Sequence, residues 1–116
     1  MSKFEDIPSC LTDIEARYNE SEKTRKKLAK FHDPIELTFL DTGRKVLIIL
    51  NGDEGIEIKD NTGDDTAVVK IEFEAEKTLI DLFNKEIGAV KAYSSGQITV
   101  VEGKIRNLLK LKSLLF

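Results

Sequence analysis

The pattern of apolar and polar positions in the middle of the chain predicts a β-sheet. Residues 35–39 and 67–73 alternate between apolar and polar side chains, as strands with one buried face do. Residues 46–50 are apolar throughout, which predicts an inner strand, and Ile56 with Ile58 predicts a short third strand. Glycine-containing turns separate the first three strands, so we expect them to form an antiparallel meander.

Helical periodicity predicts helices on both sides of this strand region. Residues 1–31 predict two helices, and the capping-box spacing of Asn19 with Glu22 indicates where the second one begins. Residues 78–93 carry a broad apolar arc on one side of a helical wheel. Gly88 interrupts this segment, so we expect it to divide into two helices.

The end of the chain predicts a fifth strand and a last helix. Ile98 and Val100 predict the strand. Its connection from the strand at 67–73 is long and helical, so if the two strands are neighbours they should run parallel with a right-handed crossover. In the leucine-rich tail, residues 104–116, most apolar side chains share one arc and Leu114 falls outside it. Either the sheet or a ligand must cover this apolar surface.

Length and composition limit the class of protein. A chain of 116 residues has the size of one domain, and we expect residues 1–116 to form a single one. With 41% hydrophobic and 34% charged residues the chain is globular rather than disordered, and its strands with flanking helices predict an α+β fold. No apolar run is long enough to span a bilayer. A single cysteine excludes an internal disulfide, so we expect a reducing, cytoplasmic setting.

The charges are unevenly distributed along the chain. The net charge of −3 argues against general nucleic-acid binding. Residues 53–76 contain nine acids and two lysines. The second predicted helix is basic instead, through Lys23, Arg25, Lys26, Lys27 and Lys30. These side chains predict either a solvated helix face or a transient contact with an anionic membrane surface.

Few residues could carry catalysis. Cys10 and His32 are the sole cysteine and histidine, so no nucleophile with a base and an orienting group can be assembled, and we expect no enzyme. The chain also lacks a phosphate-binding glycine loop and a complete calcium loop, so we expect no cofactor and no metal. One enzymatic alternative stays open: a small α+β isomerase would need an inward carboxylate, from Asp81 or Glu86.

The segment K-A-Y-S-S-G-Q-I-T-V at residues 91–100, with Glu102-Gly103 and the leucine-rich tail after it, resembles the sterol carrier protein type 2 domain. The order of elements matches that family over nearly the whole chain. The resemblance implies a five-stranded, mostly antiparallel sheet in the order 3-2-1-4-5, with helices packed on one face. It also implies an apolar tunnel between the sheet and the helices for an acyl chain or a sterol.

Three residues depart from the family pattern. Ala89 stands where the family often has proline, and Gln97 stands where it often has lysine or arginine. Val101 is an additional residue before Gly103, which indicates a β-bulge. Because a one-residue slip exchanges the two faces of a strand, the inward face of residues 97–102 stays open at this point.

The resemblance and the apolar faces predict binding, and with it transfer, of a fatty acid, acyl-CoA, sterol or other lipid. The candidate lining residues come from the sheet, the later helices and the tail: Leu37, Phe39, Ile48, Val69, Ile71, Phe73, Leu79, Leu82, Phe83, Ile87, Val90, Tyr93, Ile98, Val100, Leu108, Leu111 and Leu115. In this hypothesis movement of residues 111–116 opens the tunnel. In the alternative, the apolar tail docks on another protein or on a second copy of the chain, as a homo-oligomer.

Overall fold

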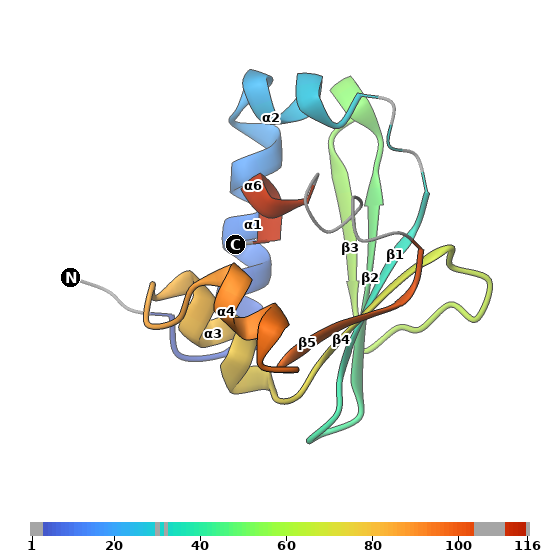
Figure 1. Cartoon of the computed structure of the whole chain (residues 1–116). Coiled ribbons are helices and arrows are strands. Elements are labelled where there is room, and N and C mark those ends of the chain that lie inside the picture. Colours follow the sequence, from blue (N-terminus) through green and yellow to red (C-terminus); the bar gives the residue numbers. More distant parts are fainter. Residues whose placement is uncertain (1–3, 30, 32, 104–110, 116) are drawn as a thin grey trace.

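Five strands form one mixed sheet in the order β3-β2-β1-β4-β5 (Figure 1). The structure, a computed structural model, describes residues 4–29, 31, 33–103 and 111–115. The strands are β1 (Ile35–Phe39), β2 (Arg44–Leu50), β3 (Ile56–Asp60), β4 (Val69–Phe73) and β5 (Ile98–Glu102). Because β1 pairs antiparallel with β2, and β2 with β3, the predicted meander is confirmed, and so is the strand order.

The predicted direction of the last strand is wrong. β4 and β5 are neighbours but run antiparallel, with Phe73 opposite Ile98, and the parallel pair is β1 with β4. The connection contains two helices, which carry the chain out over the sheet and back to the end that it left. The N–H of Glu74 accordingly donates to the carbonyl of Gln97 at 2.8 Å, where β4 ends and β5 begins. A parallel β4–β5 pair would have needed a connection that crosses the sheet once, from the end of β4 to the opposite end, where β5 would begin.

Helices cover one face of the sheet, as expected (Figure 1). They are α1 (Ile7–Asn19), α2 (Glu22–Lys27), α3 (Glu76–Phe83), α4 (Ala89–Ser94) and α6 (Lys112–Leu115), and a short 3-10 turn, η1 (Gly52–Glu54), joins β2 to β3. Two predicted breaks are confirmed, the one between α1 and α2 and the one at Gly88 before α4. The tail forms α6 in its described part, and residues 104–110 lie outside the described residues.

The first two helices begin at side-chain caps. The carboxylate of Asp6 accepts the N–H of Ser9 at 2.9 Å, and the hydroxyl of Ser21 accepts the N–H of Thr24 at 3.2 Å. The predicted cap at Asn19 is wrong, because Asn19 is still the last residue of α1. The chain turns after it, and Ser21 is the residue that precedes the first turn of α2.

The inner face of the sheet is apolar across the strand register. Leu37 in β1 lies between Val46 of β2 and Ile71 of β4, and all three are at most 1% exposed. In the next inward row, two residues further along β1 and β4, Phe39 and Phe73 are register partners whose rings stack with centroids 5.2 Å apart and planes 23° apart. Alternation therefore places one continuous apolar layer against the helices.

A bulge in β5 resolves which face of this strand points inward. Lys70 pairs with Glu102, and the next residue of β4, Ile71, pairs with Val100, so Val101 is the additional residue. Val101 is 49% exposed, whereas Ile98 is 1% exposed and Val100 packs against the core cluster. The bulge predicted from the sequence is confirmed, and it keeps both expected residues on the inner face.

Arg44 fixes the start of α3 to the sheet. Its guanidinium donates to Asp60 of β3 at 2.9 and 2.7 Å and to Glu76 of α3 at 3.1 Å. These hydrogen bonds to Arg44 hold the pKa of the Asp60 carboxyl below its usual range. The carboxylate of Asp41 also accepts the N–H of Glu76 at 3.1 Å. Charged and backbone contacts thus place the N-terminus of α3 at the end of the sheet.

Tyr18 makes the corresponding connection for α1. Its side chain is completely buried, and its hydroxyl accepts the N–H of Gly52 at 2.8 Å. Gly52 has a φ of 61°, so it starts η1 in the left-handed region. The hydrogen bond therefore links the end of α1 to the turn between β2 and β3.

Replacing Tyr18 by phenylalanine tests this link. Tyr18→Phe keeps the buried ring but leaves the N–H of Gly52 without its acceptor, so we expect the free energy of unfolding to fall by about 1–3 kcal/mol. Urea denaturation measures the change. The matched control is Tyr93→Phe, because Tyr93 is 40% exposed and should shift stability by less than about 0.5 kcal/mol. Equal effects of the two variants would contradict the role of this hydrogen bond.

Candidate functional site

Most of the predicted lining residues meet in one layer between the sheet and the helices. Those at most 4% exposed are Leu37, Phe39, Ile48, Val69, Ile71, Phe73, Leu79, Leu82, Phe83, Ile98, Leu111 and Leu115. Ile87 and Val100 are partly buried and pack against the same cluster, and Leu108 lies outside the described residues. The cluster is thus built from strands and helices that are distant in the sequence.

Val90 and Tyr93 are not part of this layer, so their predicted place in it is wrong. Val90 is 76% and Tyr93 is 40% exposed, and the inward residue of α4 is Ala92, which is completely buried. The prediction treated residues 78–93 as one continuous helical wheel. The chain leaves helical geometry after α3 and passes through Lys85 at a φ of 62°, so α4 starts with a new rotation about its axis.

The link between α3 and α4 is held at its start by a contact to the N-terminal segment. The side-chain amide of Asn84 accepts the N–H of Phe4 and donates to its carbonyl, each at 2.8 Å. The ring of Phe4 meets that of Phe83 edge to face, with centroids 5.2 Å apart. This closure covers the end of α3, and sequence periodicity gave no signal for it because the partners are 80 residues apart.

The described part of the tail packs into the cluster. Leu111, Leu114 and Leu115 are completely buried, although Leu114 falls outside the predicted arc. Leu111 directly precedes α6, and its carbonyl accepts the N–H groups of Leu114 at 3.0 Å and of Leu115 at 2.9 Å. These side chains are covered by their own molecule, which removes them as a surface for docking on a partner.

Arg17 on α1 contacts both the tail and α3. Its guanidinium donates to the carbonyl of Leu114 at 3.5 Å and lies 4.3 Å from the ring centroid of Phe83. Asp13, one turn earlier on α1, pairs with the same guanidinium at 2.6 Å and orients it. One partly buried cation therefore joins three of the helical segments that border the apolar cluster: α1, α3 and the tail.

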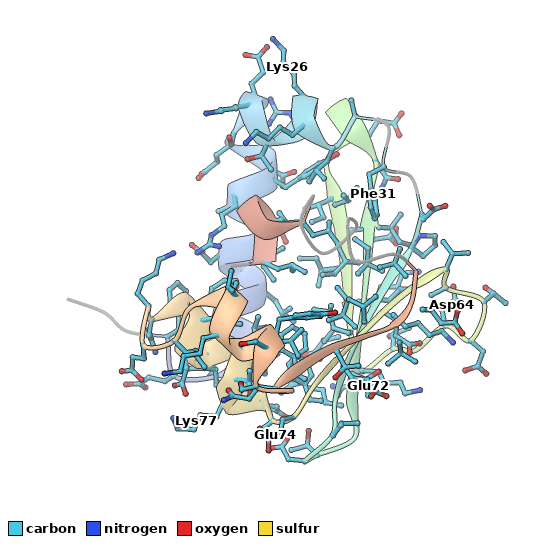
Figure 2. The ribbon with its side chains drawn as sticks, in the orientation of Figure 1. Lys26, Phe31, Asp64, Glu72, Glu74 and Lys77 are labelled. Carbon is cyan, nitrogen blue, oxygen red and sulfur yellow. The ribbon has the colours of Figure 1, made fainter. Side chains whose placement is uncertain are left out.

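The carboxylates required by the enzymatic alternative do not face this cluster. Asp81 pairs with Lys77 at 2.7 Å on the outer side of α3, and Glu86 is exposed. Lys77 is visible at the edge of the molecule in Figure 2. The inward acid that an isomerase-like site needs is therefore not supplied by Asp81 or by Glu86.

One carboxylate that sequence reasoning missed is buried on the opposite face of the sheet. Glu36 is 3% exposed, and its carboxylate accepts the N–H of Asp64 at 2.7 Å and lies 3.9 Å from the ammonium of Lys45. Figure 2 shows Asp64 on the loop beyond the sheet, away from the helices. Gly63 allows the close approach, since a Cβ there would lie 2.8 Å from the Lys45 side chain. Glu36 anchors this loop and takes no part in the apolar cluster.

The basic helix α2 uses some of its charge internally. Lys26 pairs with Glu22 at 3.2 Å, and Arg25 donates to the carbonyls of Tyr18, at 3.0 Å, and Asn19. Lys23 and Lys27 are exposed, and Figure 2 shows Lys26 at the far end of the helical side. Lys30 lies outside the described residues. α2 thus offers ammonium groups to solvent, and none of its residues Glu22–Lys27 is a large exposed apolar side chain.

Cys10 is completely buried in α1 and belongs to the core cluster. Burial, assisted by the negative charges of Asp6 and Asp13, raises the pKa of its thiol to about 12. Such a thiol is neutral at physiological pH and is no nucleophile.

The raised pKa of Cys10 predicts a pH dependence of stability. The unfolded thiol ionises near its ordinary pKa of 9.0 and the folded one only near 12, so its contribution is complete below pH 9 and is lost progressively above it. We expect the free energy of unfolding to fall by about 1 kcal/mol more in the native protein than in Cys10→Ala between pH 8 and pH 10. Urea titrations at both pH values measure this difference. Parallel loss in the two proteins would contradict the burial of the thiol.

No helix among the described residues is long and apolar enough to cross a membrane. No family model matches the chain, and no curated protein matches it. The similarity to known proteins therefore lies in the three-dimensional arrangement, an open mixed sheet of five strands with its apolar face covered by helices.

Solved structures define the fold to which this arrangement belongs. A crystal structure of sterol carrier protein 2 matches with a TM-score of 0.67 and 18% identity, over 97% of this chain and 91% of the other. Palmitated SCP2L2 from Aedes aegypti matches with a TM-score of 0.66 and 12% identity, over 94% and 95% of the two chains. The chain therefore has the sterol carrier protein 2 fold, which confirms the resemblance found in the sequence.

The same fold occurs within a larger enzyme. A stereoselective inverting sec-alkylsulfatase from Pseudomonas sp. matches with a TM-score of 0.68 and 15% identity, over 88% of this chain. This chain spans 15% of the length of the sulfatase. The match describes a shared fold.

Proposed function

We propose that residues 1–116 act as one domain that binds a single apolar ligand, such as a fatty acid, an acyl-CoA or a sterol, between the sheet and the helices. The observation that carries this proposal is the layer of buried apolar side chains enclosed by the sterol carrier protein 2 fold. The Aedes aegypti protein of this fold has been solved in palmitated form, which supports an acyl chain as the ligand class.

The lining of the ligand site is proposed from the side chains that face each other across this layer. Leu37, Ile71 and Phe73 offer the sheet side, and Leu79 and Phe83 of α3 offer the helical side. Binding would be driven by removal of apolar surface from water, at roughly 25 cal/mol per Å². Such a site needs few polar groups, which suits a cluster in which the buried residues are almost entirely hydrophobic.

Lipid extraction from the purified protein, with native mass spectrometry of the intact chain, tests the proposal directly. We expect each protein molecule to carry about one lipid molecule, since the proposed site takes a single apolar ligand. The matched comparison is the protein after delipidation and incubation with palmitate. A chain that carries no lipid after either treatment would contradict the proposed function.

Adding volume to the interior tests where the ligand lies. Ala92 is completely buried on the inner side of α4, so Ala92→Leu extends a side chain into the proposed site. We expect a lower affinity for a fluorescent fatty acid, because the added group takes the place of ligand. For the same reason the free energy of unfolding should fall by less than about 1 kcal/mol. In a filled interior, overpacking would instead cost about 1–3 kcal/mol.

The control for this variant is Ala29→Leu, which makes the same chemical change at an exposed position after α2. It should leave both the affinity and the stability unchanged. Unchanged affinity in Ala92→Leu, or a large loss of stability without a ligand effect, would contradict a ligand site beneath α4.

Arg17→Gln tests whether the tail controls ligand exchange. The substitution removes the contacts of the guanidinium to Leu114 and to the Phe83 ring, so we expect ligand to dissociate faster, on the order of several-fold. Stopped-flow transfer of a fluorescent fatty acid to acceptor vesicles measures the rate. Arg25→Gln is the control, because Arg25 also donates to backbone carbonyls but at the junction of α1 and α2. Equal rates in the native protein and Arg17→Gln would contradict the role of the tail.

A further inference from the structure

The outer face of α4 is apolar where solvent should favour polar side chains. Val90 is 76% exposed and Tyr93 is 40% exposed, and their i, i+3 spacing places them side by side on the same face of the helix. Ala92, the buried residue of α4, lies about 160° from Val90 around the helix axis. The helix therefore has one side in the proposed ligand layer and the other side, apolar as well, in solvent.

Two lysines lie close to this apolar pair in the sequence. Lys85 in the link and Lys91 on α4 are exposed, and neither ammonium forms an ion pair with a carboxylate in the part of the chain that the structure describes. Long lysine side chains can extend along a membrane surface to the headgroups, and tyrosine places a phenol at the level of the interface. Apolar side chains with flanking cations are the composition of an interfacial helix.

We propose that the outer face of α4, with Val90 and Tyr93 flanked by Lys85 and Lys91, is the surface through which this chain docks on a lipid bilayer. The proposal rests on the proposed function, and it identifies the surface of this chain that would contact the membrane. It differs from the prediction that the basic helix α2 makes this contact, because α2 exposes charge with no large apolar side chain to insert.

The size of the patch favours a bilayer over a protein partner. A stable protein interface buries roughly 800 Å² on each side, far more than two side chains and a partly buried Ile87 can supply. Shallow insertion into a bilayer instead strengthens with each apolar side chain that leaves water, and anionic lipids add the attraction of the lysines. A second copy of the chain on this face is thus an outcome that the experiment must detect.

The chain contains no tryptophan, so a single substitution gives an unambiguous reporter. In Val90→Trp we expect the emission to move to shorter wavelength when vesicles of phosphatidylcholine with phosphatidylglycerol are added. The matched reporter is Leu40→Trp, because Leu40 is 57% exposed in the turn between β1 and β2, and it should not respond. Equal shifts of the two reporters, or no shift in Val90→Trp, would overturn the proposal.

Loss-of-binding variants complete the test. The pair Val90→Asp with Tyr93→Asp should reduce vesicle sedimentation on the order of tenfold or more, whereas Lys23→Glu with Lys27→Glu on α2 should leave most of it. The reverse ranking, or self-association that depends on Val90, would overturn the assignment of this face. Lipid content is also measured on every variant. Bound lipid without vesicle docking would overturn only the docking surface, whereas absence of lipid from every variant would overturn the proposed function.

Discussion

The alternation of side chains along the strands is the constraint on which the rest of this structure depends. Each strand sends every second residue to one face, and the register aligns these residues into rows such as Val46, Leu37 and Ile71. A slip of one residue in β1 would place Glu36 and Thr38 against the helices and expose Leu37. The helices can cover only the face that the register makes apolar, so the position of any ligand site between the layers follows from it.

Apolar burial does not fix where each helix lies, because it has no direction. In this molecule polar contacts supply that information. The hydroxyl of Tyr18 holds α1 to the turn at Gly52, and Arg44 holds the first residue of α3 to the sheet. Arg17 joins the tail to α1 at the carbonyl of Leu114. These contacts position the helices, whereas the described core cluster between the layers consists of hydrophobic side chains.

Much of the architecture could be predicted because it is encoded locally. Alternation indicated the strands, Gly88 indicated the division of the later helices, and the additional residue Val101 indicated the bulge. The direction of β5 could not be predicted, because it depends on how two helices return over the sheet. The inward faces of the helices were predictable only as far as each helix is continuous, so Val90 was misplaced once the link through Lys85 changed the rotation of α4.

The elements around the apolar layer differ in how much they bury. α1 contributes five buried side chains, from Ile7 to Tyr18, so its displacement would expose a large part of the core. α4 contributes one fully buried side chain, Ala92, and a partly buried one, Ala89, and each methyl group is worth only about 1 kcal/mol. A ligand that entered or left beside α4, as proposed, would therefore disturb the fold less than one that displaced α1. If the outer side of α4 rests on a bilayer, as proposed, the ligand would enter from the bilayer beside a helix whose displacement exposes little of the core. Val90 would then lie in the hydrocarbon of the bilayer at this entrance.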